Sequence, residues 1–86
     1  MEIVTAVRVI APYVLEITFS DGVRRQVDVE SALFGDAFAP LRDPTVFAQV
    51  SVDPVLGTTV WPNGADLSPE FLYSAPAVES VGATAS

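Results

Sequence analysis

The side chains of this chain that could take part in chemistry are carboxylates, guanidinium groups and hydroxyls. The sequence holds eleven Asp and Glu residues and four arginines, and it contains no histidine, cysteine or lysine. Those three missing types provide most general bases, activated nucleophiles and soft-metal ligands near neutral pH. The composition therefore argues against most enzyme chemistries, and we expect no catalytic residue, no metal site and no cofactor.

Carboxylates alone could still form an acid–base pair or bind a hard cation such as calcium. The acidic residues are scattered singly, however, and Asp21, Asp43 and Asp53 each lie in a predicted turn or helix cap. No stretch has the spacing of a calcium-binding loop, and a Walker phosphate-binding loop would need a lysine. A weak carboxylate-based enzyme or a small-ligand-binding protein therefore stands as the alternative to a non-catalytic protein.

The net charge of −7 restricts the partners that the composition favours. The cations are too few for the basic patch that binds a phosphate backbone, so we expect no direct contact with nucleic acid. A protein partner or a homo-oligomer remains compatible with the charge. No apolar run is long enough to cross a membrane, and the N-terminus lacks the basic start of a signal peptide. Because the absence of cysteine fits a reducing compartment, we expect a cytoplasmic location and no membrane partner.

Residues 3–30 have the pattern of a three-stranded antiparallel meander. In the second hairpin, a three-residue loop 20–22 pairs Leu15 with Val27 and keeps the apolar side chains on one face, with Gly22 in the left-handed region. Arg25 then falls opposite Ile17 on the inner face, where we expect its guanidinium to reach water or a carboxylate. The same reasoning predicts a first loop at 10–12. The strand before it, 3–9, is apolar on both sides.

The rest of the chain predicts short helices and a hairpin-like C-terminal segment. Residues 30–34 form a single helical turn, and Asp43 followed by Pro44 predicts a helix of about eight residues. Strands are expected at 50–52 and 58–61, a turn at 62–64, and a last helical turn from Ser68. We therefore predict a small two-layer α+β domain over residues 1–73, with a disordered tail over 74–86.

Three segments have a distinctive pattern: residues 15–22, residues 38–53, and above all residues 57–73 with their Trp-Pro-Asn-Gly-Ala-Asp stretch. Taken together, they resemble the small bacterial family labelled domain of unknown function 2442. It implies a small α+β fold without an assigned enzymatic activity. It also implies a gene often placed beside that of another small protein, as in toxin–antitoxin pairs. Some relatives add a helix-turn-helix, for which the 13 residues after Tyr73 leave too little room.

The segment 61–66 is the candidate recognition surface, and its candidate binding residues are Trp61, Asn63, Gly64 and Asp66. Tryptophan offers a large contact area with an indole donor, Asn-Gly exposes backbone, and Asp66 adds a fixed charge. The structural alternative is that Trp61 fills the core, the turn reverses the chain, and Asp66 caps backbone amides before Pro69.

Taken together, these features predict a non-enzymatic protein–protein interaction module. Its partner would be a small neighbouring protein, in an antitoxin-like or regulatory arrangement. The doubly apolar first strand motivates this hypothesis, because its edge could pair with another chain. Homodimerisation through the sheet edges is a further possibility.

Overall fold

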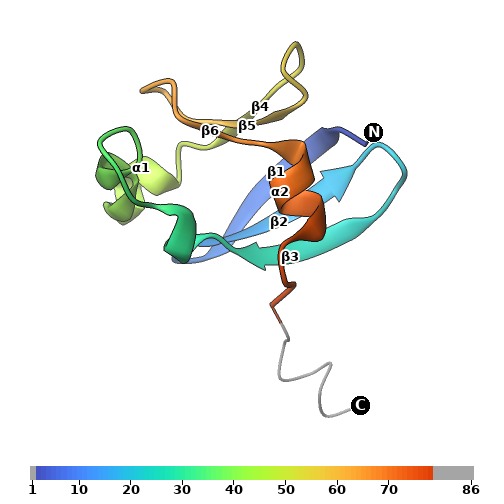
Figure 1. Cartoon of the computed structure of the whole chain (residues 1–86), viewed down its shortest axis with the longest axis horizontal. Helices are drawn as coiled ribbons and strands as arrows, with labels where there is room; N and C mark the ends of the chain where they lie inside the picture. The colour runs from blue at the N-terminus through green and yellow to red at the C-terminus, as the bar shows by residue number, and fades with distance from the viewer. Residues whose placement is uncertain (1, 79–86) are drawn as a thin grey trace.

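The computed structural model describes residues 2–78, which form a small α+β domain, as predicted (Figure 1). It has two three-stranded antiparallel sheets, the second with one strand more than the predicted hairpin-like segment. Sheet A has the order β1 (Val4–Ala11), β2 (Val14–Phe19) and β3 (Arg24–Asp28). Sheet B has the order β4 (Ser51–Asp53), β5 (Thr58–Val60) and β6 (Asp66–Leu67). The helical elements are the 3₁₀ turns η1 (Glu30–Ala32) and η2 (Ala39–Arg42) and the helices α1 (Pro44–Phe47) and α2 (Pro69–Ser74). No helix in this part of the chain has the length and apolarity needed to cross a bilayer.

The hairpin between β2 and β3 has the predicted register. Leu15 pairs with Val27, Ile17 pairs with Arg25, and Gly22 has a φ of 89° in the loop. The side-chain carboxylate of Asp21 accepts a hydrogen bond of 2.9 Å from the Val23 amide, which stabilises the turn. The requirement to keep one face apolar was therefore sufficient to select the three-residue loop.

The first hairpin turns two residues later than predicted. β1 continues to Ala11, and the turn is made by Pro12 and Tyr13, with Tyr13 at a φ of 65°. Val7 and Val9 still lie on the inner face opposite Ile17 and Leu15, because two bulges in β1 correct the register. The Tyr13 conformation is unusual for an aromatic residue, and tertiary contacts described below hold it in place.

The core lies between the inner face of sheet A and the helical and sheet B segments that cover it. All of its members are almost fully buried, and each layer contributes to it. They are Val4, Leu15, Ile17, Phe19, Val27, Val29, Leu33, Leu41, Phe47, Trp61, Ala65, Leu67 and Leu72. Every second residue of β2 is buried, which confirms the strand with one buried face that the period-2 pattern of the sequence predicts.

Both predicted helix starts are present. The Asp43 carboxylate accepts a hydrogen bond of 2.9 Å from the Thr45 amide, and the Ser68 hydroxyl accepts one of 3.0 Å from the Phe71 amide. The helix α1 has four residues, shorter than the eight expected, because Val50 already leads into β4.

The ordered contacts continue past residue 73. α2 ends at Ser74, Ala77 forms an isolated antiparallel bridge with Val27, and the Val78 amide donates to the Gln26 carbonyl at 2.7 Å. The segment 75–78 thus lies along the outer edge of β3. The remainder of the predicted tail, 79–86, lies outside the described residues.

Candidate functional site

Trp61, the most prominent candidate binding residue, lies in the core. Only 3% of its surface is exposed, and its indole nitrogen donates to the Phe47 carbonyl at 3.0 Å. Its ring lies 5.8 Å from that of Phe47, measured between centroids. Trp61 therefore joins sheet B to the C-terminal end of α1, and this contact satisfies its polar atom within the domain.

The three other candidate residues of the segment are exposed. Asn63 donates to the Ala37 carbonyl at 2.8 Å and accepts from the Ala65 amide at 3.1 Å, so its side chain ties the turn to the chain before η2. Gly64 has a φ of 88°, which the turn requires. The carboxylate of Asp66 has no hydrogen-bond partner among residues 2–78 and lies at the start of β6. A binding role for the segment stays a prediction, although the structure gives Trp61 and Asn63 internal partners.

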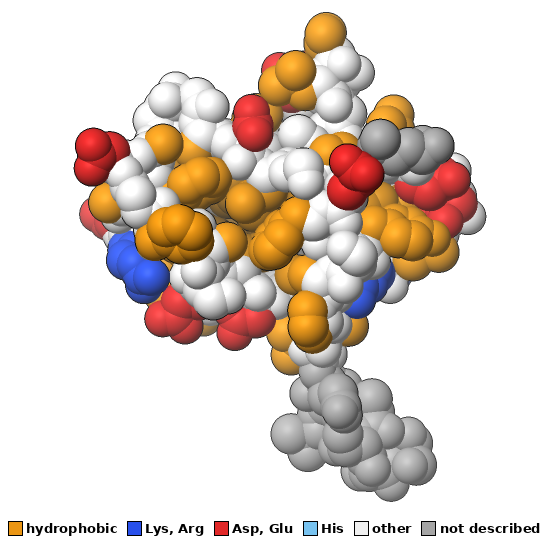
Figure 2. All heavy atoms as spheres, in the orientation of Figure 1, with side chains coloured by type: hydrophobic (Ala, Val, Ile, Leu, Met, Phe, Trp, Pro, Cys, Tyr) orange, Lys and Arg blue, Asp and Glu red, His pale blue; other side chains and the backbone are white. Residues whose placement is uncertain are grey.

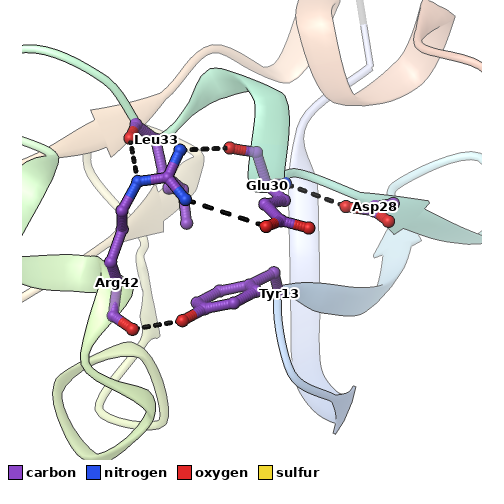
Figure 3. A network of polar contacts seen from close by, with 5 residues as sticks. All are labelled: Tyr13, Asp28, Glu30, Leu33 and Arg42. Carbon is purple, nitrogen blue, oxygen red and sulfur yellow. Dashed lines mark hydrogen bonds and ion pairs between the residues drawn. The ribbon is translucent and has the colours of Figure 1, made fainter.

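A second polar cluster links the first hairpin to the helical segment (Figure 3). The Arg42 guanidinium donates to the Leu33 carbonyl at 2.9 Å and to the Glu30 carbonyl at 3.3 Å, and it lies 3.7 Å from the Glu30 carboxylate. The Tyr13 hydroxyl donates to the Arg42 carbonyl, and the Tyr13 ring packs edge-on against Phe47. These contacts offset the strain of the positive φ at Tyr13.

A shallow cleft of about 620 Å³ lies beside this cluster, lined by Asp28, Glu30, Ser31, Arg42 and residues 76–78. It has the mixed charge of a solvated groove. Among the described residues, no group of three or more carboxylates is placed to hold a metal ion.

Arg25 has a structural partner that the sequence did not indicate. Its guanidinium donates to the Leu72 carbonyl at 2.6 Å and also to the Ala75 carbonyl, at the C-terminal end of α2. Cations are favoured there because the last carbonyls of a helix lack partners within it. The expectation of water or a carboxylate was therefore wrong, and Arg25 instead fixes α2 across sheet A.

A hydrogen-bonded pair joins the second hairpin loop to α2. The Tyr73 hydroxyl donates to the Asp21 carboxylate at 2.6 Å. This bond lowers the pKa of Asp21 and raises the pKa of Tyr73, with the Val23 amide adding to the effect on Asp21. Both groups are at the surface, and the bond is strongest between the two pKa values. It weakens as the pH falls through the lowered pKa of Asp21 or rises through the raised pKa of Tyr73.

The two edges of sheet A differ in what covers them. The outer edge of β3 is lined by the segment 75–78, as described above. β1 is the opposite edge, and in the described part of the chain no further strand is hydrogen-bonded to it as a member of sheet A. β1 also lies against β4 and β5 of sheet B, and near its start the Val4 amide donates to the Gly57 carbonyl at 2.8 Å. Beyond that point Ala6 and Ile10 are exposed, and Val7 and Val9 are half-buried.

The outer face of sheet A carries two of the four arginines. Arg8 lies opposite Glu16 and donates to its carboxylate at 3.0 Å, and Arg24 lies opposite Thr18. These residues, with Ala6 and Val7, line a concave surface of about 410 Å³. The face therefore carries two guanidinium groups, one of them paired with a carboxylate, in a chain whose overall charge is strongly negative.

These features define a small α+β domain in which β1 forms one edge of sheet A. The chain belongs to the family described as protein of unknown function DUF2442, whose model matches residues 4–76. The family predicted from the sequence is thus confirmed. A comparison with proteins of curated function found no match.

A crystal structure from Nitrosomonas europaea is similar to this chain and is described as that of a candidate DNA-binding protein. The two share 36% sequence identity with a TM-score of 0.66, over 72% of this chain. The match covers 41% of the other protein, so this chain spans less than half of its length.

This similarity contradicts the prediction that nucleic acid is excluded as a direct partner. A protein with a related sequence and a similar fold is described as a candidate DNA-binding protein, so the exclusion based on composition does not stand. The physical reason is that net charge averages over the whole surface, whereas binding depends on where individual cations lie. Arg8 and Arg24 show the difference, because they share one face of sheet A.

Proposed function

We propose that this protein is a non-enzymatic interaction domain that binds another protein chain along the edge of β1. The observation that carries the proposal is the edge of this eight-residue strand beyond Val4, to which no further strand is hydrogen-bonded among residues 2–78. An exposed edge presents unpaired backbone amides and carbonyls, and an added strand satisfies them while pockets for alternate side chains give specificity.

The side chains of β1 support this role. Ala6 and Ile10 present exposed apolar surface along the edge, Val7 and Val9 pack half-buried against the core, and Arg8 is the strand's single charged residue. Natural edge strands are protected by lysine, proline, inward-pointing charge or bulges, and of these devices β1 carries only two bulges. The bulges at Thr5 and Ile10 limit the flat length that a partner strand could use.

The proposed partner is a small protein with a basic patch on its surface, because complementary charge speeds its encounter with an acidic surface. An antitoxin-like or regulatory pairing with the product of a neighbouring gene is one form that it could take. The proposed location is the cytoplasm, where a chain without cysteine is compatible with the reducing conditions.

Direct contact with DNA is the second candidate function, and the similar protein from Nitrosomonas europaea favours it. The surface that fits is the outer face of sheet A, where Arg8 and Arg24 flank a concave region. Phosphate contacts from such side chains would make binding weaken steeply as salt is added.

Affinity purification from the native host, with the proteins encoded beside it co-expressed, tests the main proposal. Wild-type protein should retain a stoichiometric protein partner, and Ala6→Lys should lose it, because a lysine on an edge strand disfavours further pairing. Ala48→Lys is the matched control, since Ala48 is exposed just after α1 and the substitution changes charge equally. Finding neither a protein partner nor self-association by sedimentation would refute the proposal.

A mobility-shift titration with labelled duplex DNA separates the second candidate from the first. If sheet A contacts DNA, wild-type protein shifts the duplex at low salt and Arg24→Ala weakens the shift. Ala6→Lys should then retain or strengthen it, which is the opposite of its expected effect on a protein partner.

A further inference from the structure

The hairpin between β4 and β5 has an apolar tip that projects from the body of the domain. Val55 is 91% exposed and Leu56 is 55% exposed, and Ile3 beside the hairpin is 42% exposed. We call these three residues the apolar tip. Figure 1 shows the hairpin rising away from sheet A, and Figure 2 shows hydrophobic side chains at its summit. Burying such side chains against another molecule would be favourable, because each removes apolar surface from water.

Hydrogen bonds of Asp53 and contacts with the start of the chain order the tip. The Asp53 carboxylate accepts hydrogen bonds from the Val55 amide at 2.8 Å and from the Leu56 amide at 3.1 Å. The Gly57 amide donates to the Asp53 carbonyl at 2.7 Å, and the Gly57 carbonyl accepts from Val4. Ile3 packs against Gly57 so closely that an added Cβ would lie 2.9 Å from it. A surface ordered in advance loses less conformational entropy on binding than a flexible loop.

The charge around the tip indicates the chemistry of its partner. No cationic residue follows Arg42 in the sequence, so the hairpin and all of sheet B carry only acidic charge. Asp53 lies at the base of the tip, whereas Asp66 pairs with Val60 at the opposite end of β5. Carboxylate side chains lie below the hydrophobic summit in Figure 2. Acidic charge at the base of the tip, with no cation in the hairpin, disfavours phosphate groups and a second copy of the same surface, and it favours a cationic one.

We infer that the apolar tip inserts into an apolar pocket, rimmed by lysine or arginine, on a partner protein. The inference rests on the proposed function and adds a second contact, because the tip adjoins the start of β1 through the Val4–Gly57 bond. The β1 edge would supply backbone pairing, and the tip would supply the buried anchor on which binding affinity concentrates.

Photo-cross-linking in the native host tests the inference. Benzoylphenylalanine in place of Val55 should cross-link to one partner protein, at a residue in an apolar pocket with basic side chains at its rim. The matched control is benzoylphenylalanine in place of Phe34, which is 72% exposed and lies in another region, between η1 and η2. Cross-links to nucleic acid or to a second copy of this chain would overturn the inference, as would a yield at position 55 no higher than at position 34.

Binding to the cross-linked partner, purified and titrated, gives the quantitative test. Val55→Ser combined with Leu56→Ser should weaken binding about tenfold or more, whereas Phe34→Ser should leave it unchanged. Added salt should weaken the wild-type complex because the basic rim faces acidic groups. If Ala6→Lys abolishes binding while the double tip variant binds normally, the tip inference fails and the proposed function stands. If wild-type protein captures no partner in either experiment, both fail.

Discussion

The two turns of sheet B contain similar residues, but one is tied to the rest of the domain and the other leaves its apolar side chains exposed. Each contains a proline and a glycine of positive φ, namely Gly57 at 68° after β4 and Gly64 at 88° after β5. The turn at 61–65 buries Trp61 and is tied by Asn63 to the carbonyl of Ala37. The turn at 54–57 bonds mainly to its own strand and leaves its apolar side chains exposed.

This difference teaches that residue type alone does not identify a recognition surface. The segment 61–66 has the tryptophan, asparagine and aspartate that are common in binding sites, yet its tryptophan stabilises the core. The segment 54–57 has no tryptophan, asparagine or aspartate, yet it contains Val55, the most exposed large hydrophobic residue among residues 2–78. The two segments differ in their neighbours. The 61–66 segment bonds to α1 and to the segment before η2, and the 54–57 segment does not.

The largest expected effect is that of removing the indole from the tied turn. Trp61→Ala should lower the free energy of unfolding by about 3–5 kcal/mol, because it leaves a cavity and removes the indole hydrogen bond to the Phe47 carbonyl, which keeps only the Val50 amide as a donor. Chemical denaturation monitored by circular dichroism measures the change. A loss comparable to that of an exposed-site substitution would mean that Trp61 is not an integral part of the core, and the contrast between the turns would disappear.

The two glycines provide a matched pair that compares the turns directly. Gly57→Ala should destabilise the protein by about 1–3 kcal/mol, because it combines a strained φ with a contact of 2.9 Å to Ile3. Gly64→Ala should cost less, about 1 kcal/mol, because its added Cβ meets nothing within 4 Å. The midpoints of thermal unfolding rank the two variants, and the reverse order would contradict the close packing of Ile3 on the projecting turn.

The hydrogen bonds that tie the 61–65 turn should have a smaller effect. Asn63→Ala removes the bond to the Ala37 carbonyl and the bond from the Ala65 amide, at an expected cost of about 1–2 kcal/mol. Asp66→Asn is the neighbouring control, since its carboxylate has no hydrogen-bond partner in the described residues. Denaturant titration of both variants checks the difference, and equal stabilities would show that Asn63 does not tie down the turn.

The smallest expected effect on stability is at the apolar tip. Val55→Ser should change the free energy of unfolding by no more than about 0.5 kcal/mol, because Val55 is almost fully exposed and packs against nothing. The same denaturant titration measures it. A substantial loss of stability would show that the tip packs against the protein itself, and its role as a docking element would then be untenable.

Much of the architecture follows from local sequence rules. The apolar alternation along β2, together with the Asp21-Gly22 loop, selected the observed register, since any one-residue shift would have buried polar side chains. Asp43-Pro44 and Ser68-Pro69 marked the helix starts because their side chains and fixed φ angles satisfy the first turn. The family was likewise evident from the sequence.

Other features depend on contacts between distant segments. The two-residue strand β6 is too short to have a periodic pattern, and its pairing with β5 defines it. Tyr13 adopts a positive φ because Arg42 and Phe47 hold its side chain. Arg25 reaches the end of α2, 47 residues away in sequence, so no local signal could reveal its partner.

The sequence by itself determined the fold class, the register of the second hairpin, the helix starts and the absence of histidine, cysteine and lysine side chains. Each of these depends on residue type or on neighbours within a few positions. Only the tertiary structure decided which sheet edge stays open, which turn is tied to the core and which one projects. Those outcomes depend on how much surface distant segments cover, and a linear pattern of apolar and polar residues does not record that.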